Sequence, residues 1–147
     1  SEQNAQVVPM VTHPFAMTNW TPQTQFTEEK CLAPYYYRDT LMHGFRGTHW
    51  LSGSCVQDYG SFTIMPLSGE LLTTEEARAS AFSHDREVAT PAYYSVELER
   101  YGIQAELTAT TRAGVLRFTF EQSEDAYILI NPNSDEAQGF VEIDVEN

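Results

Sequence analysis

The feature that most constrains the fold is an alternation of apolar and polar residues in the second half of the chain. It is clear in three consecutive segments after Tyr93 and returns near the C-terminus. Successive side chains of a β-strand point to opposite faces, so a period of two predicts strands with one buried face. The expected inward sets are Tyr94, Val96 and Leu98; Ala105, Leu107 and Ala109; Leu116, Phe118 and Phe120; and Val141, Ile143 and Val145.

Turn residues separate these closely spaced strands, which predicts an all-β fold, an antiparallel β-sandwich. Residues 126–130, AYILI, are apolar at every position and indicate a central strand. The segment 73–80 predicts one short helix outside the core, because Thr73 and Glu76 fit a capping box. A length of 147 residues indicates a single domain, 1–147.

The net charge excludes some classes of partner. The chain has 21 acidic and eight basic residues, a formal charge of −13. Nucleic acids and anionic membranes need basic patches, so we expect neither as a partner. We expect neither a signal peptide nor a membrane-inserting segment within these 147 residues, because no apolar run is long enough. Its two cysteines, Cys31 and Cys55, are compatible with one bridge or with two thiols.

Residues 43–60, HGFRGTHWLSGSCVQDYG, combine glycine and serine with aromatic and ionisable side chains. The glycines predict a structured loop, and loops of this composition often carry binding residues. A surface connection held by its own aromatic side chains is the alternative. Both interpretations remain open from composition alone.

Catalytic signatures are weak in this sequence. The adjacent acidic pairs fall in predicted loops or on the helix surface, where carboxylates are ordinarily solvated. A triad of Ser52 or Ser54 with His49 and Asp58 has no nucleophile elbow to support it. Cys55 could act as a nucleophile with His43 or His49, but nothing in the sequence predicts the lowered thiol pKa that this role needs.

Sugar binding fits the aromatic residues better. Trp20 and Trp50 offer flat apolar faces on which sugar rings can stack, while Arg46, His49 and Asp58 could bind hydroxyl groups. Trp50 could instead anchor the loop, and Trp20 could belong to the core.

Four segments together resemble a known family. They are PFAMTNWTPQT (14–24), YYYRDTLMHGFRGTHWLSGSCVQDYG (35–60), TIMPLSG (63–69) and FSHDREVATPAYYSVELERYGIQAELTATTRAGVLRFTF (82–120). In this order they resemble the N-terminal domain of glycoside hydrolase family 92, the calcium-dependent exo-acting α-mannosidases of bacteria and fungi. The resemblance covers nearly the whole chain.

The resemblance implies a supersandwich of the galactose-mutarotase-like type, at the N-terminus of a larger bacterial enzyme that is secreted or periplasmic. A C-terminal α/α-barrel of the same polypeptide would supply the catalytic acid, the catalytic base and the calcium ligands. This chain would then carry no catalytic residue and no metal ligand, and would be inactive alone. Its loop 43–60 would face a mannose-containing glycan, with His49 and Trp50 as the main contacts.

The sequence departs from the family pattern at two places. Ala16 stands where the family usually has glycine, and Arg46-Gly47 replaces Ser-His. The second change alters the loop that shapes the leaving-group side of the substrate site. A stand-alone carbohydrate-binding domain and a purely structural scaffold remain alternatives.

Overall fold

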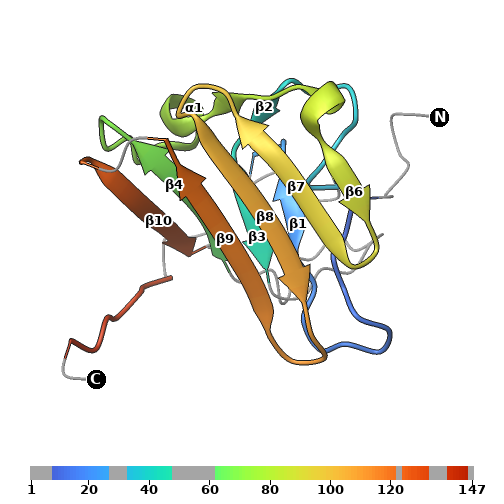
Figure 1. Cartoon of the computed structure of the whole chain (residues 1–147). Helices are drawn as coiled ribbons and strands as arrows, with labels where there is room; N and C mark the ends of the chain where they lie inside the picture. Colours follow the sequence, from blue (N-terminus) through green and yellow to red (C-terminus); the bar gives the residue numbers. More distant parts are fainter. Residues whose placement is uncertain (1–7, 27–32, 48–61, 122–123, 133–138, 146–147) are drawn as a thin grey trace.

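The computed structural model describes residues 8–26, 33–47, 62–121, 124–132 and 139–145. Two four-stranded sheets face each other (Figure 1), and every strand pair is antiparallel. The rear sheet has the order β1-β3-β4-β10. Its strands are β1 (Thr21–Gln23), β3 (Gly44–Gly47), β4 (Phe62–Ser68) and β10 (Ala126–Pro132). The predicted all-β antiparallel sandwich is confirmed.

The front sheet is a simple meander of four strands, β6-β7-β8-β9. They are β6 (Val88–Thr90), β7 (Tyr93–Leu98), β8 (Ile103–Ala109) and β9 (Gly114–Phe120). A two-stranded sheet of β2 (Leu41–Met42) and β5 (Ser80–Ala81) lies at one end. The turn after β7 contains Gly102 at φ +59°, a left-handed conformation that glycine adopts without steric cost.

The core lies between the two sheets. Tyr94, Val96, Leu98, Ala105 and Leu107 are at most 1 % exposed, as the alternation predicts. Phe45, Met65 and Leu67 of the rear sheet belong to the same buried cluster, and Ala109, Leu116, Phe118 and Phe120 pack against it partly buried. One outward position differs from the prediction. Ser95 is only 7 % exposed, because it lies in the interior of the sheet between Val88 of β6 and Glu106 of β8.

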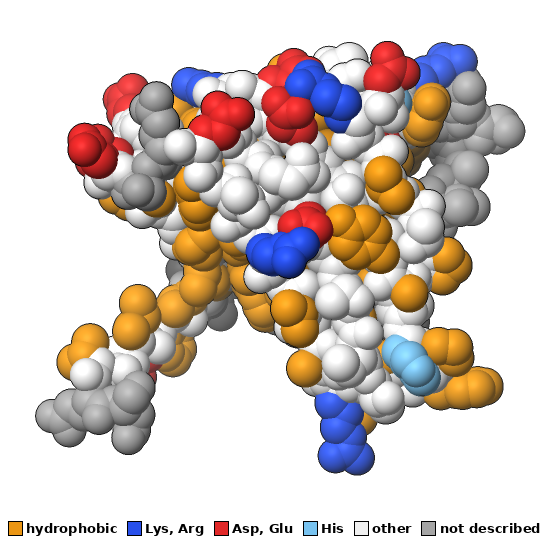
Figure 2. Space-filling model, viewed as in Figure 1, with side chains coloured by type: hydrophobic (Ala, Val, Ile, Leu, Met, Phe, Trp, Pro, Cys, Tyr) orange, Lys and Arg blue, Asp and Glu red, His pale blue; other side chains and the backbone are white. Residues whose placement is uncertain are grey.

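The prediction of a central strand at 126–130 is wrong. In the described part of the chain β10 pairs with β4 alone and lies at the sheet edge. Its Ile128 and Ile130 are 49 % and 42 % exposed. Val141, Ile143 and Val145 are not in a strand, and Figure 2 shows hydrophobic side chains gathered along β10 and the C-terminal segment. An apolar run and a period of two are both local patterns. Neither specifies which segments a strand will pair with, so neither could predict these features.

The predicted helix forms, but it is shorter and more closely packed than expected. Helix α1 spans Glu75–Arg78, and the Thr74 side chain caps it by accepting a hydrogen bond from the Ala77 N–H. Thr73 is therefore not the cap. The helix was expected outside the core, yet its Arg78 is only 1 % exposed. A second short helical turn, η1, spans His84–Arg86.

Candidate functional site

The predicted loop, 43–60, is wrong at its start, because Gly44–Gly47 form the buried strand β3. The rest of the loop leaves and re-enters the rear sheet at one place. Gly47, the last residue of β3, pairs with Phe62, the first residue of β4. Residues 48–61, between these anchors, lie outside the described residues, and with them the predicted contacts His49, Trp50 and Asp58. Both cysteines also lie outside the described residues. The described structure therefore shows the base of the loop.

Trp20 packs directly beneath these two anchors. Its indole meets the Phe62 ring edge-on, with a centroid separation of 5.5 Å, and its backbone forms a bridge with Val11. Only 5 % of Trp20 is exposed. A sugar ring needs an accessible aromatic face on which to stack, so this burial favours the core role that the sequence left as the alternative.

Two glycines make room for the Trp20 indole. A Cβ atom on Gly47 would lie 2.8 Å from the six-membered part of the ring, and one on Gly114 would overlap the indole nitrogen. Gly47 is in the rear sheet and Gly114 begins β9 in the front sheet. Trp20 therefore links both sheets at the end of the sandwich from which the loop emerges.

Arg46, the other described candidate, is also buried. It is 3 % exposed and lies opposite Thr21 of β1 and Thr63 of β4 in the strand register. Thr63 donates a hydrogen bond to Gln23 at 2.7 Å, and neither of these two side chains is exposed. Where β1, β3 and the start of β4 pair, the face of the rear sheet opposite Phe45 thus carries a layer of buried polar side chains.

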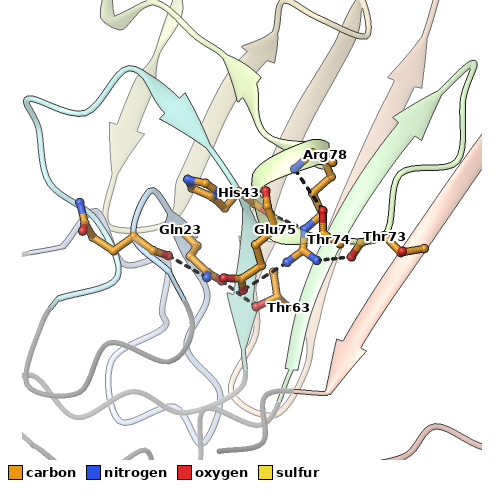
Figure 3. Close-up of polar contacts among 9 residues, drawn as sticks. Gln23, His43, Thr63, Thr73, Thr74, Glu75 and Arg78 are labelled. Atoms are coloured by element: carbon orange, nitrogen blue, oxygen red, sulfur yellow. Dashed lines mark hydrogen bonds and ion pairs between the residues drawn. The ribbon is translucent and has the colours of Figure 1, made fainter. Parts of the chain in front are cut away.

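Helix α1 extends this layer through Arg78 (Figure 3). The guanidinium donates to the His43 carbonyl at 3.2 Å and to the Thr73 carbonyl at 3.1 Å, and forms an ion pair with Glu75 at 3.4 Å. Burial lowers the pKa of Arg78, while the Glu75 carboxylate acts in the opposite direction. The imidazole of His43 donates from Nδ1 to the Glu75 carbonyl oxygen at 3.1 Å. These contacts fix α1 against the start of β3.

A second buried polar centre forms around Glu87. Its carboxylate accepts hydrogen bonds from the hydroxyls of Tyr35 at 2.9 Å and Tyr94 at 2.6 Å, and it contacts His84 Nδ1 at 2.5 Å. Burial and the nearby carboxylate raise the pKa of both tyrosines, so both hydroxyls remain protonated donors. The ring of Tyr37 stacks on His84 with centroids 4.1 Å apart.

Neither polar centre is predicted by the sequence. Glu87 and Arg78 resemble surface charges in the sequence, and no local pattern marks them as buried. Within the described ranges, no group of three His, Cys, Asp or Glu residues could hold a metal ion. No described helix is long and apolar enough to span a membrane.

Comparison with known proteins identifies the family. Residues 1–147 match the glycosyl hydrolase family 92 N-terminal domain. The chain belongs to glycosyl hydrolase family 92. This confirms the resemblance carried by the sequence motifs.

Solved structures of family 92 enzymes show the same fold. An α-mannosidase from Bacteroides thetaiotaomicron, in complex with mannoimidazole, is 37 % identical with a TM-score of 0.77, over 87 % of this chain and 18 % of that one. An inverting mannosidase from Bacteroides thetaiotaomicron VPI-5482 is 41 % identical with a TM-score of 0.74; the match covers 86 % of this chain and 17 % of that one. The chain thus spans less than a fifth of these family 92 enzymes. No curated protein matches it.

Proposed function

We propose that this chain is the N-terminal domain of an α-mannosidase that acts on mannose-containing glycans. The observation that carries the proposal is the match to the family 92 N-terminal domain along the entire chain. Two structurally similar family members are mannosidases, and one of them is complexed with mannoimidazole.

In this proposal the domain forms one wall of the substrate site and performs no chemistry. An inverting glycosidase needs a general acid and a general base on opposite sides of the scissile bond, with room for a water molecule between them. We assign that pair of carboxylates to the C-terminal α/α-barrel. Following the resemblance to the family, we assign a calcium ion of the enzyme to the same barrel. Its contribution would be to hold and polarise sugar hydroxyl groups.

The loop between β3 and β4 would carry the sugar contacts. His49 and Trp50 are the leading residues, and Asp58 lies in the same loop. Trp20 and Arg46 are buried at or next to the loop base, so we assign them to positioning the loop. The apolar face of a tryptophan and a few fixed polar groups are the usual means of orienting a pyranose.

The experiment is the Trp50→Ala substitution in the full-length enzyme, assayed with an aryl α-mannoside. A substrate loop predicts a raised KM or a lowered kcat with an unchanged unfolding midpoint. A structural scaffold predicts that activity falls only together with stability. Tyr37→Ala is the control, since it removes a 69 % exposed aromatic ring outside the loop and should leave the kinetics unchanged.

The isolated chain provides an independent check. Purified alone, it should not hydrolyse aryl mannosides, because the catalytic carboxylates are assigned to the barrel. Turnover by the isolated chain would contradict this assignment. The proposed secreted or periplasmic location in a bacterium is tested separately, by fractionating cells that express the native gene.

A further inference from the structure

A pocket lies at the opposite end of β3 from the base of the substrate loop. It is a pocket of about 390 Å³ between α1 and the segments that precede β2 and follow β1. Its lining includes Phe26, Arg38, Asp39, Thr40, His43 and Glu76. The volume falls at the lower end of the roughly 300–1,000 Å³ of small-molecule pockets.

One carboxylate in this pocket is held in a fixed orientation. The hydroxyl of Thr24 and the amide of Gln25 both donate hydrogen bonds to Oδ2 of Asp39. Thr24 is fixed in turn by the backbone N–H of Tyr36, which donates to its Oγ1 at 3.0 Å. The second carboxylate oxygen, Oδ1, receives no hydrogen bond within the described chain. Asp39 can therefore present a preoriented acceptor without losing side-chain freedom on binding.

An aromatic ring lies in the same pocket. Phe26 is 42 % exposed, and its ring contacts the imidazole of His43 with centroids 5.0 Å apart. His43 is fixed because its Nδ1–H donates to the Glu75 carbonyl oxygen. Phe26 thus rests on an immobilised ring while much of its own surface remains accessible. An aromatic ring supported on one face in this way can stack against a ligand with its other surface.

We propose that this pocket binds a neutral pyranose ring, as a saccharide site separate from the loop between β3 and β4. The C–H face of the sugar would stack on Phe26, and a sugar hydroxyl would donate to Oδ1 of Asp39. Thr40 and Glu76, both exposed at the pocket wall, provide further hydroxyl and carboxylate partners. Donors and acceptors placed beside one apolar face match a polyol ring better than a charged ligand.

The pocket and the described base of the loop lie at opposite ends of β3. His43 immediately precedes β3 and the loop begins after Gly47, so the four strand residues between them span roughly 13 Å. The pocket site therefore does not depend on the proposed role of the loop. It would bind a second sugar unit or a different branch of a glycan.

The test is an NMR titration of the 147-residue chain with methyl α-D-mannopyranoside, following backbone amide shifts. The expected result is saturable shifts of the amides of Thr24, Thr40 and Leu41. The amides of the loop between β3 and β4 should either not shift or shift with a different binding constant. Phe26→Ala should weaken this binding roughly tenfold or abolish it. Asp39→Asn, which keeps an acceptor oxygen but removes the charge, should weaken it less.

Two controls make the outcome decisive. Phe15→Ala removes a phenylalanine that is fully exposed outside the pocket, and it should leave the shifts unchanged. Glycerol offers hydroxyl groups without a ring face, so equal shifts with glycerol would overturn the stacking argument. The proposal also fails if mannoside gives no shifts at the pocket, or if Phe26→Ala leaves them intact while its amide spectrum remains that of a folded chain.

Discussion

At the scale of single residues, the structure depends on a few buried charges with defined partners. Glu87 is the clearest case, because its side chain is only 7 % exposed and accepts hydrogen bonds from two tyrosines. Tyr94 is part of the sandwich core, whereas Tyr35 comes from the long connection before β2. Glu87 thus joins a segment of irregular backbone to the front sheet.

The first prediction concerns this carboxylate. Glu87→Ala should lower the free energy of unfolding by about 2–4 kcal/mol, because it leaves two buried tyrosine hydroxyls without an acceptor. Glu70→Ala changes an exposed glutamate and should alter stability by less than about 0.5 kcal/mol. Urea denaturation of both variants provides the comparison. Equal stability of the two would show that the tyrosines find other partners.

The second prediction is a pH effect at Glu106 on the outer face of β8. Hydrogen bonds from Arg117 and Tyr93 lower the pKa of Glu106 to about 2, with the Arg117 contacts contributing most. A lowered pKa means that the ionised form stabilises the fold. This contribution is fully present above the usual glutamate pKa of about 4.3 and is lost as the pH falls through about 2.

Replacing Arg117 tests this assignment. Arg117→Met should raise the pKa of Glu106 toward its ordinary value, as measured by carboxyl NMR titration. The loss of stability at neutral pH should be small, because water screens this exposed pair. Arg112→Met, in the turn between β8 and β9, is the control and should leave the titration of Glu106 unchanged.

At the scale of elements, the short helix α1 is held in place by contacts with other parts of the chain. Helix α1 has four residues, too few to be stable alone, yet its Arg78 binds backbone carbonyls of Thr73 and His43. Tertiary contacts rather than helix propensity must therefore hold it in place. The capping pattern in the sequence predicted a helix here, but it could not predict that the last helical residue, Arg78, would be buried.

The third prediction distinguishes the two neighbouring threonines. Thr74→Ala should destabilise the fold by about 1 kcal/mol, because the Ala77 N–H loses its capping acceptor. Thr73→Ala should have little effect, since Thr73 contributes only its backbone carbonyl to the contact with Arg78. Thermal unfolding of the pair decides which residue is the cap. A larger loss from Thr73→Ala would restore the capping box expected from the sequence.

At the scale of the whole molecule, Trp20 connects the two sheets beneath the substrate loop. It lies against Gly47 and Phe62 of the rear sheet and Gly114 of the front sheet. A change in the spacing of the sheets at this end would therefore move both anchors of the loop. This coupling relates the packing of the core to the proposed contacts with substrate.

The fourth prediction tests that packing. Gly114→Ala should cost about 1–3 kcal/mol of stability, because the added methyl group overlaps the Trp20 indole. In a Trp20→Phe background the same substitution should cost less, since the smaller ring leaves room for the methyl group. A double-mutant cycle measures the difference. Additive effects would mean that the methyl group is accommodated without displacing the indole.

The sequence by itself determined the fold class, the inward faces of β7, β8 and β9, and the family. These follow from local information, because alternation along a strand is fixed by backbone geometry and the motifs are read directly. Only the tertiary structure decided that β10 is an edge strand, that Trp20 is buried, and that Arg78 and Glu87 lie inside. Those properties depend on which distant segments meet, and a charged residue has the same local pattern whether its partner is water or a tyrosine.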